Sequence, residues 1–152
     1  MPKRLTPRGV PARKSRVCAD LVPAYRNTTY AVDAALPFAV YVGQASGPLR
    51  SLMAQHQCQS AAYITACNPS GRCLTDGQNA LRQAALAEYL RRSGYVFFSG
   101  QGQGADAYWK AEPSFLVLGM PLQMAKALAR RWRQNAILWC GADAVPQLVW
   151  MR

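Results

Sequence analysis

The sequence predicts a single α/β domain with a mixed β-sheet and about three helices, in the order ββαβαββαββ. Short apolar runs typical of strands alternate with longer segments whose apolar residues recur with helical spacing. Residues 61–66 are apolar on both faces, as expected for a central strand that is covered on both sides. The chain has 152 residues, of which 51% are hydrophobic and 16% charged, which is typical of one folded domain with its own core.

The chain begins with a segment of different composition. Residues 1–16 contain six cations, three prolines and no acid, a pattern that predicts a disordered basic tail. The single α/β domain is therefore predicted to span residues 17–152.

The first half of the domain is predicted to contain two strands and a helix. Residues 25–32 are rich in β-formers, and residues 38–42 follow after a short connection, so the two strands should form an antiparallel pair. Ser46, Gly47 and Pro48 are typical of a helix start. One face of this helix should carry Leu49, Leu52, Met53 and His56, with the histidine at the boundary of the core.

After the strand at 61–66, the sequence predicts two further helices and four further strands. The helices should span residues 79–93, ended by Gly94, and 121–132. The strands should lie at residues 95–98, 115–118, 136–140 and 147–150. Residues 99–104 contain three alternating glycines but lack the spacing of a phosphate-binding loop, so they are predicted to form a mobile surface connection.

Polar side chains adjoin three of the buried strands and form the candidate ligand-binding site. They are Thr65, Asn68, Asn79, Trp109, Glu112 and Gln134. Hydroxyl, amide and indole groups give directed hydrogen bonds without titrating near neutrality, which favours recognition of a small polar ligand. The last three reach the same sheet end as the first three only if their strands run antiparallel to the central strand. The alternative interpretation is that these groups cap strands and tie loops to the core.

The charge balance supports a second hypothesis, binding of nucleic acid or another polyanion. Lys plus Arg number 18 against 7 Asp plus Glu, which gives a net charge of +11. Besides the tail, Lys126, Arg130 and Arg133 follow one another at helical spacing and form the candidate nucleic-acid-binding row. The alternative is a solvated helix face, and no recognisable RNA-binding signature accompanies the charge.

A third hypothesis is an enzyme that uses Glu112 or Cys67. A nucleophilic cysteine needs a neighbouring base or a helix N-terminus, and the residues beside Cys67 include no obvious base. The five cysteines and single histidine lack the spacing of a zinc site, so we expect buried reduced thiols, no metal and no cofactor. Whether the protein is an enzyme, and its oligomeric state, stay open at this stage.

Several motifs in order resemble a bacterial family known only as domain-of-unknown-function family 3293. They are Tyr25-Arg26 with Thr29-Tyr30, Ile64-Thr65-Ala66 with Asn68-Pro69, Asn79, Trp109 with Glu112-Pro113-Ser114-Phe115, and Gln134-Asn135-Ala136. The resemblance covers about residues 25–150 and departs at Cys67, where the family tends to have an aromatic residue. It implies an intracellular bacterial protein and transfers no activity. No apolar run approaches the roughly 18 residues of a membrane helix and no secretory signal is present, so we expect a cytoplasmic protein.

Overall fold

The computed structural model describes residues 21–105 and 110–151, in which seven strands form one sheet of order β2-β1-β4-β5-β3-β6-β7. The tail at 1–16 and Trp109 lie outside the described residues. The elements are α1 (Leu21–Arg26), β1 (Thr29–Val32), β2 (Phe38–Val40), α2 (Gly47–Gln55), β3 (Ala61–Ile64), a 3-10 turn (Pro69–Gly71), α3 (Asp76–Arg92), β4 (Phe97–Gln103), β5 (Glu112–Leu118), α4 (Leu122–Arg131), β6 (Ala136–Cys140) and β7 (Gln147–Trp150). The α/β class and the predicted order of elements are confirmed, with α1 added in front.

The prediction of a mixed sheet is wrong, because every described pair of neighbouring strands is antiparallel. Strands β3 and β4 run in the same direction and are connected by α3, and β5 and β6 are connected by α4 in the same way. However, β5 lies between the first two strands and β3 lies between the second two. The helical crossovers therefore skip one strand position, and no parallel neighbours result.

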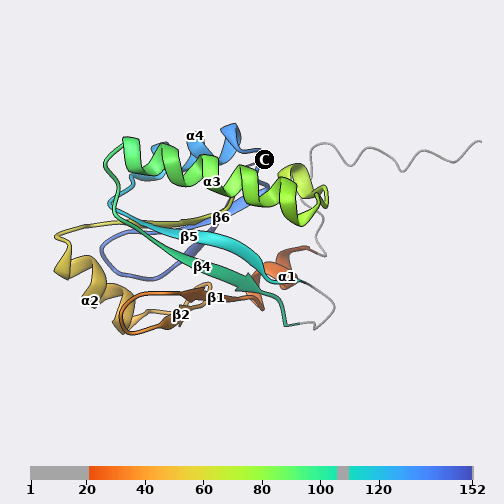
Figure 1. The fold of residues 1–152 in the computed structure, drawn as a ribbon. Helices are drawn as coiled ribbons and strands as arrows, with labels where there is room; N and C mark the ends of the chain where they lie inside the picture. Colours follow the sequence, from red (N-terminus) through yellow and green to blue (C-terminus); the bar gives the residue numbers. More distant parts are fainter. Residues whose placement is uncertain (1–20, 106–109, 152) are drawn as a thin grey trace, which may run out of the picture.

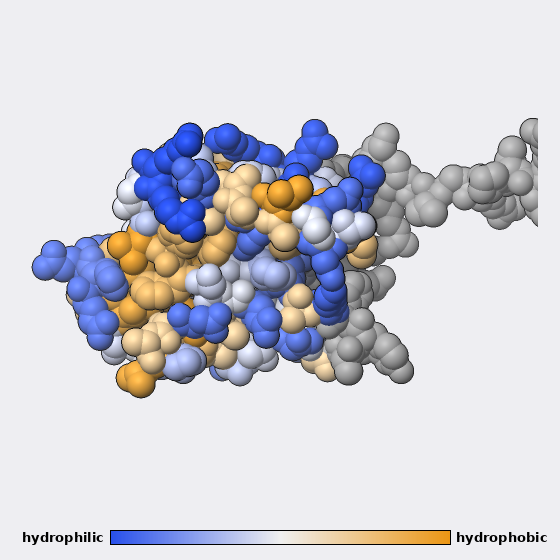
Figure 2. Space-filling model, viewed as in Figure 1, coloured by the Kyte–Doolittle hydropathy of each residue, from blue (hydrophilic) through white to orange (hydrophobic). Residues whose placement is uncertain are grey.

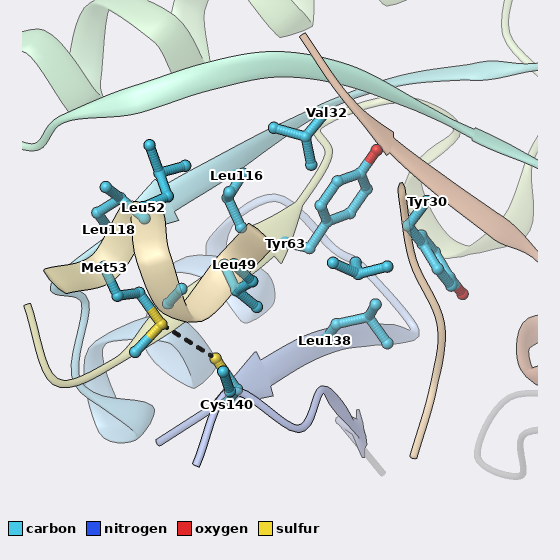
Figure 3. Close-up of a cluster of buried hydrophobic side chains, with 13 residues drawn as sticks. Tyr30, Val32, Leu49, Leu52, Met53, Tyr63, Leu116, Leu118, Leu138 and Cys140 are labelled. Atoms are coloured by element: carbon cyan, nitrogen blue, oxygen red, sulfur yellow. Dashed lines mark hydrogen bonds between the residues drawn. The ribbon is translucent and has the colours of Figure 1, made fainter. Parts of the chain in front are cut away.

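The sheet separates two hydrophobic clusters. Helices α3 and α4 lie together on one face, and α2 lies on the opposite side (Figure 1). The α2 side contains Leu49, Leu52 and Met53 packed with strand residues such as Leu116 and Leu118 (Figure 3). Figure 2 shows hydrophilic residues along the α3–α4 layer and hydrophobic residues between that layer and α2.

The sheet is strongly curled towards α2. Tyr63 of β3 donates a hydrogen bond to the carbonyl of Ala31 in β1 at 2.8 Å, although β4 and β5 lie between these strands. The rings of Tyr30 and Tyr63 are 5.2 Å apart. A further hydrogen bond connects the two edges of the sheet: the amide of Gly43, after edge strand β2, donates to the carbonyl of Pro146, in the loop between β6 and β7, at 2.7 Å. The α2 side of the sheet is therefore a concave surface with α2 over one end.

The helix boundaries follow their capping residues. Ser46 accepts a hydrogen bond from the amide of Leu49 and caps α2, as the sequence predicts. Thr75 and Gln78 form a capping box that starts α3 three residues before the predicted position. Gly94 follows α3 with φ of 77°, as expected for a left-handed helix end.

The first predicted strand is shorter than expected. Tyr25 and Arg26 belong to α1, and β1 begins only at Thr29. Two local hydrogen bonds stabilise this helical turn: the Thr28 hydroxyl donates to the Ala24 carbonyl, and the Tyr30 hydroxyl donates to the Tyr25 carbonyl. These contacts outweigh the β propensity of residues 25–28.

The prediction of a mobile connection at residues 99–104 is wrong. Strand β4 runs through Gln103 and pairs with both β1 and β5. Gly100 is required there, because a Cβ on it would overlap the Ala31 carbonyl and lie 3.0 Å from the Tyr63 hydroxyl. The glycines therefore let β1 and Tyr63 approach β4 closely.

Two apolar helix residues are exposed instead of packing in the core. Leu81 on α3 is 75% exposed and Met124 on α4 is 45% exposed, while Leu86, Leu90 and Leu128 are buried. His56 is exposed at the C-cap of α2, with its ring centroid 6.0 Å from that of Phe98. None of the helices in residues 21–105 and 110–151 has the length and apolar character needed to cross a bilayer.

Candidate functional site

The antiparallel sheet brings three of the predicted site residues to one end of β3. Strands β5 and β6 both run antiparallel to β3, so the end of β3 meets the starts of β5 and β6. Thr65, Glu112 and Gln134 lie at this end and line one pocket of about 390 Å³. The sequence alone did not show whether β5 and β6 run antiparallel to β3, and the structure shows that they do. The volume of the pocket falls in the usual range for small-molecule sites.

The pocket occupies the concave side of the sheet, at the end away from α2. On β5 the side chains of this face change from Leu118 and Leu116 to Ser114 and Glu112 as the strand approaches the pocket. Strands β4 and β6 contribute small residues at the same end of the sheet. Gly102 of β4 and Ala136 of β6 line the pocket. Beside α2, leucine side chains fill the space above the sheet. At the pocket end, the polar residues of β5 and these small residues leave the corresponding space open.

Three tyrosines form aromatic walls of the pocket: Tyr25, Tyr30 and Tyr63. The hydroxyls of Tyr30 and Tyr63 each donate to a backbone carbonyl, at 3.0 and 2.8 Å. Burial raises the pKa of all three tyrosines, so they are neutral at physiological pH. Since two hydroxyls are already bonded, their rings are held in place and present mainly aromatic surface.

Asn68 and Asn79 do not line the pocket but form a polar network next to it. The Asn68 backbone amide donates to Asn79 Oδ1, and Asn79 Nδ2 donates back to Asn68 Oδ1, both at 2.9 Å. Asn68 Oδ1 also accepts from the amide of Leu74 at 3.0 Å. Asn68 Nδ2 donates to Glu112 Oε2 at 3.0 Å, so the network orients the pocket carboxylate.

Asn68 holds an unusual backbone conformation that makes this network possible. Its φ and ψ of 48° and 61° are left-handed, a region that asparagine tolerates better than most residues. The chain thus turns sharply after β3 and enters the 3-10 turn and α3. Asn68, predicted from the sequence as a ligand-binding residue, donates to the pocket carboxylate of Glu112 from outside the pocket lining.

Glu112 is a carboxyl group in the pocket wall that is partly removed from solvent. Burial raises the pKa of its carboxyl group, and the hydrogen bond from Asn68 partly opposes this rise. Lys110 also lines the pocket, but its ammonium binds the Asp76 carboxylate at 2.6 and 2.7 Å. None of the three ion pairs within the described residues includes Glu112.

Thr65 and Gln134 also have structural contacts, as the alternative interpretation expected. The Thr65 hydroxyl donates to the Pro113 carbonyl at 2.6 Å and accepts from the amide of Cys67 at 3.0 Å. Gln134 Nε2 donates to the carbonyls of Cys67 and Trp132 at 3.0 and 3.2 Å. Both side chains therefore tie the loop after β3 to its neighbours and, at the same time, line the pocket wall.

Two α3 side chains that the sequence did not single out also support the site. Gln83 Oε1 accepts from the amide of Ala66 at 3.0 Å. Arg82 donates to the carbonyls of Ala66 and Trp132 at 2.7 and 2.9 Å, and its guanidinium lies 5.3 Å from the Trp132 ring centroid. Helical spacing could have identified these two residues, because Arg82 and Gln83 follow Asn79 at i+3 and i+4 and therefore lie on the same helix face.

Cys67 and the candidate basic row do not line the pocket. Cys67 is 1% exposed, and burial raises the pKa of its thiol, which opposes formation of a nucleophilic thiolate. Lys126 and Arg130 lie on α4, but Arg133 lies beyond the helix C-cap with φ of 55°, so the predicted row does not continue along the helix. The described residues contain no group of three or more His, Cys, Asp or Glu side chains placed to hold a metal ion.

Comparison with known proteins gives one match. Residues 64–137 match a family described as Protein of unknown function (DUF3293). This segment runs from the end of β3 to the start of β6 and includes the Asn68 network, Glu112 and Gln134. No curated protein and no solved structure matches the chain.

Proposed function

We propose that the folded domain, whose residues 64–137 belong to the DUF3293 family of unknown function, binds a small organic ligand. The ligand would occupy the pocket at the open end of the concave sheet. Because the sequence resembles an intracellular bacterial family, we further propose that the protein acts in the bacterial cytoplasm.

The observation that carries this proposal is the convergence of Thr65, Glu112 and Gln134 on one pocket. These residues are far apart in the sequence and reach the pocket from different strand ends. The pocket combines aromatic walls with a few oriented polar groups, and one of these is a carboxylate whose pKa is raised by burial. Such a combination is typical of binding sites for small molecules.

A thermal-shift screen of small metabolites and nucleotides tests the proposal when it is combined with a variant that fills the pocket. Gly102→Leu should place a flexible apolar side chain in the pocket and abolish the shift in melting temperature. Gly102→Ala is the matched control, because its Cβ would lie 3.6–3.8 Å from Thr28 and Tyr30, in ordinary contact. Equal shifts for the wild type and the leucine variant, or no shift with any compound, would refute binding in this pocket.

The charge balance supports a second candidate, association with nucleic acid. The net charge is +11, and six of the 18 cations lie in residues 1–16. On the folded body, Lys126 and Arg130 share α4, and Arg130 is exposed. A polyanion would bind such a chain mainly by releasing counterions, so its affinity would fall steeply with salt.

A salt series with labelled RNA and DNA tests this second candidate on the full chain and on a chain without residues 1–16. Loss of binding on truncation would assign the interaction to the tail. Binding by both chains at moderate salt would assign it to the folded body, and Lys126→Gln with Arg130→Gln would then weaken it. If neither chain binds, association with nucleic acid is excluded.

A further inference from the structure

We infer that the ligand of the pocket is an aromatic cation whose ammonium or amidinium group pairs with Glu112. This inference rests on the proposed ligand-binding function and names the chemical class of the ligand. It follows from the distribution of charge around the pocket and from the aromatic surface that faces the carboxylate.

Among the described residues, Glu112 is the charged group of the pocket that has no ionic partner. The ionisable residues that line the pocket are Glu112, Lys110 and three tyrosines. Lys110 is neutralised by Asp76, and the tyrosines are neutral. Within the described residues Glu112 forms no ion pair, and its hydrogen-bond donor is the neutral Asn68 amide. This is notable in a chain whose cations outnumber its acids by 18 to 7.

A half-buried carboxylate without a cationic partner is unfavourable unless another group offsets its desolvation. The Asn68 amide offsets part of this cost, and the network with Asn79 holds the carboxylate in a defined orientation. A ligand cation would supply the missing charge, and a planar amidinium can donate two parallel hydrogen bonds to a carboxylate. An anionic ligand would be repelled by the same group.

The rest of the pocket favours an aromatic body for this cation. Tyr25, Tyr30 and Tyr63 line the pocket, and the edge-to-face contact of the last two fixes their rings at 5.2 Å. Aromatic rings bind other rings by stacking or edge-to-face packing, and they attract cations through their faces. Gly102 of β4 pairs with Tyr30 of β1 and Glu112 of β5 and lines the pocket, so the absence of a side chain there keeps the space between these two residues free for the ligand.

Benzamidine, its neutral isostere benzamide and the anion benzoate form a matched set of probes. Titration calorimetry on the full-length protein should show benzamidine binding at least about tenfold more tightly than benzamide, since one charge-assisted pair is worth that much. Glu112→Gln, which preserves an acceptor for Asn68, should remove this preference, so that benzamidine binds no more tightly than benzamide. Gly102→Leu should abolish binding of both compounds.

The outcomes separate this inference from the proposed function. If benzamide or benzoate binds as tightly as benzamidine, or if the ligands found by the thermal-shift screen are neutral or anionic, the cationic assignment is overturned and ligand binding stands. If no compound in either experiment binds, the proposed function itself fails. The comparison of benzamidine with benzamide on wild type and Gly102→Leu remains decisive even if Glu112→Gln does not fold.

Discussion

Gly100 and Gly102 lie two residues apart on the same face of β4, yet only one of them is required by the fold. A Cβ at Gly100 would overlap the Ala31 carbonyl, which is backbone and cannot rotate away. A Cβ at Gly102 would meet only side-chain atoms of Thr28 and Tyr30 at ordinary distances. The first glycine therefore allows the sheet to curl, and the second leaves space in the pocket.

We expect Gly100→Ala to lower the free energy of unfolding by about 1–3 kcal/mol, the usual cost of overpacking a rigid site. Gly102→Ala should change it by no more than about 1 kcal/mol and in the stabilising direction, because alanine restricts the unfolded chain. Urea denaturation of both variants measures the difference. Equal losses of stability would show that the close approach of Ala31 to β4 does not exist.

The carboxyl group of Glu112 should make stability depend on pH in an unusual direction. Its folded-state pKa is raised above the ordinary 4.5, so the folded protein binds this proton more tightly than the unfolded chain does. The contribution of Glu112 to the free energy of unfolding should therefore fall as pH rises through 4.5 towards the folded-state pKa. Glu112→Gln lacks this titration and should gain stability relative to wild type over that window.

Urea unfolding of the wild type and Glu112→Gln across acidic to neutral pH measures this difference. The advantage of the glutamine variant should be greatest at neutral pH and should shrink in acid. An advantage that grows as the pH falls would mean that the pKa of Glu112 is lowered in the folded state. A gain in stability together with a loss of ligand binding is the pattern expected when a functional residue is replaced.

At the scale of elements, the joint between β3 and α3 organises the site. Asn68 occupies this joint with a left-handed backbone, and its side chain bonds Leu74, Asn79 and Glu112. The joint therefore holds the start of α3 and the pocket carboxylate in one network. A substitution at Asn68 should affect both the stability of the joint and the pocket.

Asn68→Gly and Asn68→Ala separate the two roles of this residue. Both variants lose the side-chain hydrogen bonds, but glycine accepts the left-handed conformation without strain. The alanine variant should therefore be less stable than the glycine variant by about 1–2 kcal/mol. Thermal and urea unfolding give this difference, and equal stabilities would show that residue 68 is not left-handed in solution. Both variants should weaken ligand binding if the network orients Glu112.

At the scale of the whole molecule, the curl of the sheet creates the pocket. The Tyr63 hydroxyl reaches across β4 and β5 to the Ala31 carbonyl and draws β1 towards β3. The pocket exists because this curl gives the sheet a concave side, which α2 covers at one end and leaves open at the other. The helices α3 and α4 cover the convex side and leave the pocket accessible.

Tyr63→Phe should test the curl, because it removes one hydrogen bond and leaves the ring. We expect a loss of about 1 kcal/mol in the free energy of unfolding and faster amide hydrogen exchange in β1 and β2 than in wild type. Exchange in β6 and β7 should change little. Tyr41→Phe is the matched control, since Tyr41 is exposed. If exchange rises equally in all strands, this hydrogen bond does not hold the curl.

Much of the fold could be predicted because alternation and helix caps are local. The sequence Glu112-Pro113-Ser114-Phe115-Leu116-Val117-Leu118 already places Glu and Ser on the same face as two leucines. Ser46 and Gly94 marked helix ends that the structure confirms. The continuation of β4 through residues 99–103 was not predicted, because its glycines have low β propensity. Glycine is needed at position 100 because the carbonyl of Ala31, which is distant in the sequence, lies against it.

By itself, the sequence determined the class of fold, the order of elements and the residue types at the candidate site. These depend on the spacing of apolar residues and on capping, which act over a few positions. Only the tertiary structure decided strand order, curl and the partners of each polar group. Strand order depends on which strands pair after each helical crossover, and no local sequence pattern encodes that choice. For this reason the same six site residues divide into pocket wall and supporting network only in the folded molecule, with Trp109 outside the described residues.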